Sequence, residues 1–149
     1  MSRRHHRRRG LDAGGQTTLL VLGFFLVAVL LIGVVVDASA AYLQRQSLNA
    51  LADGAALAAA DGVQGEQVYA GGLGEYAEID PVVAESYVRR YLADSDAGQR
   101  FPGLRWAVEH TGTSVTVRLA APLDLPIPPP GSADTALITG SASSVVIVR

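Results

Sequence analysis

The sequence predicts an α+β protein: a long N-terminal transmembrane and amphipathic helix, a short helix and a small antiparallel three-stranded sheet. Three observations support this class. An uncharged apolar run fills residues 17–36, and a proline-free stretch rich in alanine and leucine continues it to residue 61. Beyond residue 104, apolar and polar side chains alternate, which is typical of strands with one buried face. Helical and strand patterns therefore occupy separate parts of the chain.

Charge is unevenly divided along the 149 residues, whose formal net charge is −2. Residues 1–16 form a basic head with one acid and five arginines, which are Arg3, Arg4, Arg7, Arg8 and Arg9. Residues 37–149 carry an excess of acids. Arginines beside an apolar span stay in the cytoplasm. The pattern predicts a single-pass protein of the cytoplasmic (inner) membrane, with an extracytoplasmic C-terminal domain. An acidic body also excludes nucleic acid as a partner.

The apolar run predicts a transmembrane span over residues 17–36, with the lipid bilayer as its partner. Its length as a helix is about 30 Å, which equals the thickness of a hydrocarbon core. Two alternatives are a secretory signal cut near Ala38-Ser39-Ala40 and a twin-arginine export signal at Ser2-Arg3-Arg4. The run exceeds the ~7–15 apolar residues of a signal core, and His5 and His6 stand where a twin-arginine signal needs apolar residues. We therefore predict an uncleaved anchor.

Residues 37–61 predict an amphipathic continuation of the same helix, because alanine and leucine favour helices. Helical periodicity places one polar face on Arg45, Asn49 and Asp53. The opposite side carries the apolar residues expected to pack, namely Leu43, Leu48, Leu51 and Leu57. Asp61-Gly62 is expected to end the helix with Gly62 as its cap. A glycine-rich linker over 62–80 is expected to follow.

Residues 81–149 predict an exported α+β domain. Asp80 is a helix cap and Pro81 suits the first helical position, so a helix is expected from 81 to about 93. Alternation over 104–108 and 115–119 predicts an antiparallel hairpin with a buried face of leucine, tryptophan and valine. The proline-rich stretch 122–131 is expected to be extended and to lie outside any central strand. A third strand is expected within 136–148.

The residues that carry enzyme chemistry are sparse. The chain has no cysteine, which excludes disulfides and thiolate nucleophiles. His110 is the one histidine outside the basic head, with no second histidine at metal-ligand spacing. No serine lies in a nucleophile elbow, and Gly72-Leu73-Gly74 lacks the residues of a phosphate loop. The sequence therefore predicts no catalytic residue, no cofactor, no metal site and no enzymatic activity.

A set of motifs over residues 14–62 resembles the TadE/TadG-like proteins of the tight-adherence (Flp) pilus machinery. The motifs are Gly15-Gln16-Thr17-Thr18, Val36-Asp37, the stretch Tyr42 to Ala50 and the stretch Ala52 to Ala60. The resemblance implies a pilin-like or pilus-assembly subunit in the inner membrane. Processed members of this system are cut after a glycine and carry glutamate five residues later. Leu19 and Leu20 stand at that distance from Gly14 and Gly15, so the segment is more TadG-like and an unprocessed N-terminus is expected.

The main prediction is a membrane-anchored structural or assembly subunit, minor pilin-like, of a Tad/Flp-type pilus or related secretion apparatus. Its partners would be other pilus-assembly or pilin-like subunits, contacted through the N-terminal helix. The alternative is an exported extracytoplasmic binding module whose N-terminal segment is only a signal or anchor. The first predicts lateral helix contacts, and the second predicts a soluble ligand for the C-terminal domain.

Overall fold

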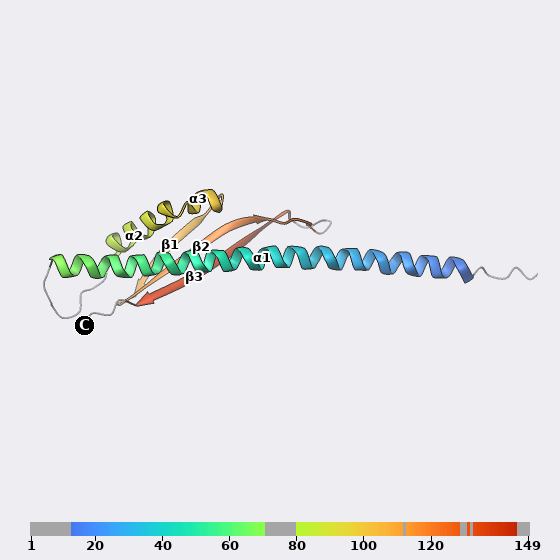
Figure 1. The fold of residues 1–149 in the computed structure, drawn as a ribbon, viewed down its shortest axis with the longest axis horizontal. Helices are drawn as coiled ribbons and strands as arrows, with labels where there is room; N and C mark the ends of the chain where they lie inside the picture. The colour runs from blue at the N-terminus through green and yellow to red at the C-terminus, as the bar shows by residue number, and fades with distance from the viewer. Residues whose placement is uncertain (1–12, 71–79, 112, 129–130, 132, 146–149) are drawn as a thin grey trace, which may run out of the picture.

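A computed structural model of the chain describes residues 13–70, 80–111, 113–128, 131 and 133–145. Its elements, in chain order, are α1 (Ala13–Ala70), α2 (Pro81–Asp94), α3 (Ala97–Arg100), β1 (Arg105–Thr111), β2 (Ser114–Asp124) and β3 (Thr135–Val145). The long helix, the short helices and the three-stranded antiparallel sheet confirm the predicted α+β class. Helix α1 runs the length of the molecule, and the other elements gather beside its C-terminal half (Figure 1).

Helix α1 is longer than the sequence predicts. It has 58 residues and continues through Gly62 to Ala70, so the predicted end at Asp61-Gly62 is wrong. Gly62 is a contact position instead: a Cβ there would meet the ring of Tyr87 on α2. Packing against α2 thus explains why this part of the helix continues. The predicted 62–80 linker is helical over residues 62–70, and its residues 71–79 lie outside the described part of the chain.

Helix α2 begins as its local signals predict. The Asp80 side chain accepts a hydrogen bond from the backbone N–H of Val82 at 2.8 Å, and Pro81 takes the first helical position. Glu85 and Arg89 form an exposed ion pair at 3.0 Å. The buried side of the helix consists of Ala84, Val88 and Leu92. This side packs against α1, with the ring of Tyr91 over Gly54.

The sheet has the order β1-β2-β3, and both strand pairs are antiparallel. In the β1–β2 hairpin Trp106 pairs with Leu119 and Val108 with Val117. These side chains share the face that the alternation predicts to be buried, so the predicted hairpin is confirmed. The third strand is also confirmed over residues 135–145. Residues 146–149, which the prediction included in part, lie outside the described residues.

The proline-rich stretch departs from its prediction at Pro122. This residue lies in β2, the central strand, and pairs with β3. The expectation that residues 122–131 stay outside a central strand is therefore wrong for 122–124. Strand β1 begins at Arg105, opposite Ala120, so β2 has a strand neighbour on one side only when it reaches Pro122. A proline is tolerated there as it is on an edge strand.

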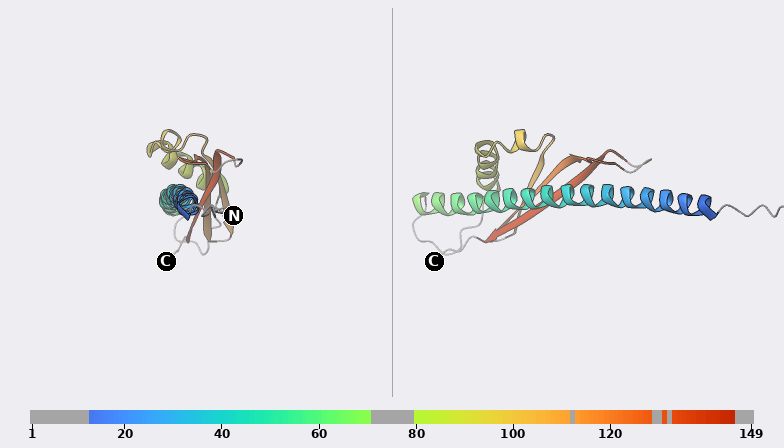
Figure 2. Two further views of the ribbon diagram at one scale, coloured as in Figure 1. Left: turned by 90° about the vertical axis from the view of Figure 1, so that its right-hand side faces the viewer. Right: turned by 45° about the vertical axis from the view of Figure 1, so that its right-hand side comes forward.

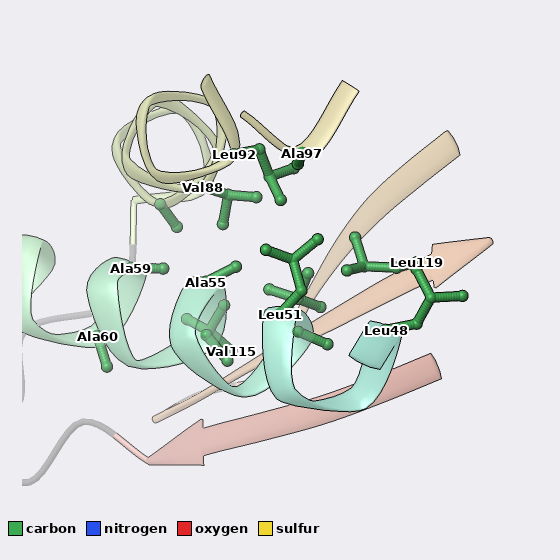
Figure 3. Close-up of a cluster of buried hydrophobic side chains, with 14 of the residues drawn as sticks. Leu48, Leu51, Ala55, Ala59, Ala60, Val88, Leu92, Ala97, Val115 and Leu119 are labelled. Carbon is green, nitrogen blue, oxygen red and sulfur yellow. The ribbon is translucent and has the colours of Figure 1, made fainter. Parts of the chain in front are cut away.

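The hydrophobic core lies between α1, α2 and one face of the sheet. Figure 3 shows Leu48 and Leu51 of α1 directed between α2 and the strands, with Val115 and Leu119 on the sheet side. The backbone of the helix lies very close to β3 at Gly140, where an added Cβ would lie 2.8 Å from backbone atoms of Leu48 and Asn49. Glycine in a strand marks such close backbone approaches. The second half of α1 is therefore an integral layer of the domain.

Candidate functional site: the two environments of α1

The first half of α1 exposes apolar side chains on all sides. Its large hydrophobic residues from Leu19 to Val36 are 38–74 % exposed. The helix is long and apolar enough to cross a membrane, and 6 % of its most apolar 18-residue window is buried within the structure. A helix that is hydrophobic all round belongs in the interior of a protein or in a bilayer. Because the rest of the domain covers little of this half, the arrangement suits membrane anchoring.

The four leucines predicted to pack divide into two pairs. Leu48 and Leu51 are 0 % and 4 % exposed, and they fill the chain's own core between α1, α2 and the sheet. Leu43 and Leu57 are 61 % and 55 % exposed. The structure therefore does not bring the four together on one free surface, and only Leu43 and Leu57 remain available to a partner. Sequence periodicity found the apolar side of the helix but could not show which part of it the sheet covers.

The predicted polar face also divides. The side-chain oxygen Oδ1 of Asn49 accepts a hydrogen bond from the backbone N–H of Ser141 at 3.2 Å, which ties α1 to β3. Arg45 is exposed and lines a surface groove together with Asn49. Asp53 is exposed and lies outside that groove. The three residues thus have different surroundings, although their spacing places them on one side of the helix.

The groove has a volume of about 410 Å³ and gathers arginines from three elements. Arg45 comes from α1, Arg105 from β1 and Arg118 from β2. Arg118 is paired with Glu109 at 3.1 Å. Guanidinium groups bind carboxylates and phosphates through paired hydrogen bonds, so the groove suits an anionic group. The sequence pattern does not reveal the groove, because Arg45 is distant along the chain from Arg105 and Arg118.

Two contacts between α1 and the β2–β3 hairpin were also missed. Gln44 donates from Nε2 to the backbone oxygen of Pro122 at 3.0 Å. Asp37, the first charged residue after the span, is 8 % exposed, and its Oδ1 accepts from the backbone N–H of Ile127 at 2.8 Å. Its second oxygen, Oδ2, is buried without a hydrogen-bond partner in the described structure. The isolated charge at the end of an apolar run was the signal that could have marked Asp37.

Other predicted features lie partly or wholly outside this arrangement. The arginines of the basic head fall within residues 1–12, which are outside the described range. His110 is exposed in β1. Within the described residues, no group of three or more histidine, cysteine, aspartate or glutamate side chains could hold a metal ion. The features that can carry a function are therefore the apolar half of α1, its exposed leucines and the arginine-lined groove.

Taken together, the fold defines a protein with one long apolar-to-amphipathic helix and a small α+β domain built on the C-terminal half of that helix. Residues 15–62 match the protein family described as "Putative Flp pilus-assembly TadE/G-like". This match confirms the predicted TadE/TadG-like resemblance, and it lies entirely within α1. Comparisons with curated proteins and with solved structures found no match. The similarity to this family is thus carried by the helix.

Proposed function

We propose that this protein is a membrane-anchored structural or assembly subunit, minor pilin-like, of a Tad/Flp-type pilus or a related secretion apparatus. The observation that carries the proposal is the composition of α1. The TadE/G-like match covers both its uncovered apolar half and the part that packs in the domain. The family is one of pilus assembly rather than catalysis, so the protein acts through contacts with other subunits.

The proposed topology follows from charge. The arginines of the basic head hold the N-terminus in the cytoplasm, residues 17–36 span the inner membrane, and the α+β domain lies on the extracytoplasmic side. The anchor is uncleaved. A cut after Ala40 would fall inside α1, one turn beyond Asp37, and would separate the domain from its membrane segment. An intact-mass measurement on the purified protein should give the mass of the uncut chain, and a mature N-terminus at Gln16 or Ala41 would show that the N-terminus is processed and contradict an uncleaved anchor.

The subunit contacts are proposed to run along the exposed side of α1. Leu43 and Leu57 project from this side while the opposite side carries the protein's own domain. Exposed apolar side chains that continue from a membrane span provide a strip on which a second helix can pack. The helices of neighbouring subunits would therefore lie side by side, with each domain facing away from the contact.

Disulfide cross-linking in native membranes tests these contacts, because the chain has no cysteine of its own. Leu43→Cys and Leu57→Cys should each form disulfide-linked dimers with a second copy of the same variant, or adducts with a pilin-like partner that carries a cysteine introduced at the facing position. Ala59→Cys is the matched control, since Ala59 is 0 % exposed and should stay unlinked. Absence of adducts at both exposed positions under oxidising conditions would contradict a role in helix assembly. Pilus ATPase, membrane-platform and short pilin genes adjacent to this gene would support it further.

A second candidate function is an exported binding module, and the arginine-lined groove is the observation that favours it. In that case an acidic peptide such as polyglutamate should bind the purified full chain. Arg45→Gln and Arg105→Gln should weaken the binding, whereas Arg90→Gln, an exposed change on α2 outside the groove, should not. Equal binding by all three variants would remove the groove as a reason to prefer this function.

A further inference from the structure

The tip of the β2–β3 hairpin reaches the apolar half of α1. Both strands extend beyond β1 and run along the helix towards its N-terminal end (Figure 1, and Figure 2, right). Strand β2 ends at Asp124, and the backbone N–H of Leu125 donates to the oxygen of Asp134 across the tip at 2.8 Å. The described residues 125–128, Leu-Pro-Ile-Pro, carry no charge. We call these four residues the hairpin tip.

Two contacts fix the hairpin tip against α1. The backbone N–H of Ile127 donates to Oδ1 of Asp37 at 2.8 Å. The Ile127 side chain lies over Gly33, where an added Cβ would be 3.3 Å from Cγ2 of the isoleucine. Gly33 is the one buried residue of the predicted span 17–36, all of which is described. The contact therefore reaches into the span itself.

The position of Ile127 along the helix axis determines its surroundings in a membrane. Gly33 lies four residues before Asp37, which is about 6 Å closer to the centre of the bilayer at ~1.5 Å per residue. Ile127 is 50 % exposed at this level, and Pro126 beside it is exposed. If residues 17–36 span the bilayer, the uncovered side of Ile127 faces lipid.

The N–H groups of the hairpin tip are suited to that environment. An N–H group without a partner is costly in lipid. Leu125 and Ile127 donate theirs to Asp134 and Asp37, and Pro126 and Pro128 have no N–H to satisfy. All four residues can therefore enter the edge of the bilayer without an unpaired donor. Proline weakens a strand because it has no N–H to donate, and the same property removes two donors that would otherwise need partners in lipid.

We propose that the hairpin tip dips into the outer surface of the lipid bilayer beside α1 and gives the domain a second membrane contact. This inference rests on the proposed membrane anchor. A single spanning helix leaves the domain free to tilt relative to the bilayer, whereas a second contact at one side of the helix restricts that tilt. The exposed strip of Leu43 and Leu57 would then be held at a defined angle to the bilayer, where a neighbouring subunit can meet it.

Fluorescence quenching in liposomes of phosphatidylcholine and phosphatidylglycerol tests the proposal with the full chain. Single cysteines at Leu30, Ile127 and Thr113 would each carry a small fluorophore. Thr113 is exposed at the opposite end of β2, so it is the aqueous reference. A nitroxide on the lipid chain near the headgroup should quench the labels at positions 30 and 127, whereas aqueous iodide should quench the label at 113.

The three labels separate the possible failures. If the label at 127 behaves like that at 113 while the label at 30 stays in lipid, the hairpin-tip proposal is wrong and the anchor stands. If the label at 30 is quenched by iodide, the anchor itself is wrong, and the tip contact fails with it. Agreement between positions 30 and 127 supports both.

A second pair of variants tests whether the label at 127 is quenched because Ile127 packs on Gly33. Gly33→Leu places a large side chain where Ile127 packs, so lipid-borne quenching of the label at 127 should be lost. Gly23→Leu is the matched control within the same span, because nothing lies within 4 Å of a Cβ at that position. Equal quenching in the two variants would overturn the part of the proposal that places the hairpin tip beside α1 through the contact at Gly33.

Discussion

Replacing Gly140 with alanine tests the close backbone approach between α1 and β3. The new Cβ would lie 2.8 Å from the amide nitrogen of Asn49 and from the carbonyl carbon of Leu48. Both are backbone atoms of α1, so neither can rotate out of the way as a side chain can. Ordinary contacts begin near 3.4 Å. The helix and β3 must therefore move apart by about 0.6 Å, which strains a tightly packed interior.

Two destabilising effects and one stabilising effect determine how much Gly140→Ala changes the free energy of unfolding. Overpacking of this kind costs ~1–3 kcal/mol. The separation also lengthens the hydrogen bond from the Ser141 N–H to Asn49, already 3.2 Å, and its loss costs about 1 kcal/mol. Alanine returns roughly 0.5–1 kcal/mol, because glycine loses more conformational entropy on folding. The costs exceed the gain, and we expect Gly140→Ala to lower the free energy of unfolding by about 2 kcal/mol.

The assay is a urea titration of the full chain in detergent micelles, followed by the fluorescence of Trp106, the single tryptophan. With a slope of ~1–2 kcal/mol/M, the midpoint should fall by about 1–2 M. Gly65→Ala is the control, since a Cβ there meets nothing within 4 Å. Its midpoint should stay or rise, because alanine favours a helix over glycine by about 1 kcal/mol. A Gly140→Ala midpoint equal to wild type would refute the reasoning about the helix–strand contact.

Three further predictions use the same titration. Leu48→Ala should cost ~2–5 kcal/mol because Leu48 is fully buried, whereas Leu43→Ala at an exposed position should cost under about 0.5 kcal/mol, and equal costs would contradict the division of the leucines. Gly62→Ala should lower the midpoint, because its Cβ would meet the ring of Tyr87; a rise would show that Gly62 acts as an ordinary helix glycine. Asn49→Ala should lower the free energy of unfolding by about 1 kcal/mol and speed deuterium exchange at the Ser141 amide, which donates to Asn49. Asn49→Asp keeps an acceptor oxygen, so exchange at that amide should be slower than in Asn49→Ala. Unchanged exchange in Asn49→Ala would mean that this hydrogen bond does not hold β3 to α1.

Local signals were sufficient for several elements. The cap at Asp80 and the proline after it act within one turn, so the start of α2 could be predicted from the residues alone. Alternation over the β1–β2 hairpin fixed its buried face for the same reason, since side-chain direction in a strand repeats every two residues. The span and its helical continuation were also predictable, because both depend on composition along one continuous stretch.

Features that depend on distant residues could not be predicted in this way. Gly62 looks like a helix cap by itself and becomes a contact position only because Tyr87 packs over it. The bond between Asp37 and Ile127 joins residues 90 positions apart. The candidate site was therefore predicted in part: the sequence located the apolar side of α1, but the sheet determines that Leu48 is internal and Leu43 is free.

A cysteine-accessibility scan along α1 in native membranes tests the central claim most directly, namely that one continuous helix passes from lipid into a domain that it helps to build. A membrane-impermeant maleimide applied from the extracytoplasmic side should label no position over 19–36. Beyond Asp37 it should label positions 45 and 53, which are exposed and lie away from the strip of Leu43 and Leu57, and leave 48, 52, 55 and 59 unlabelled, in step with their exposure. Labelling within 19–36, or equal labelling of the two sets, would contradict the account.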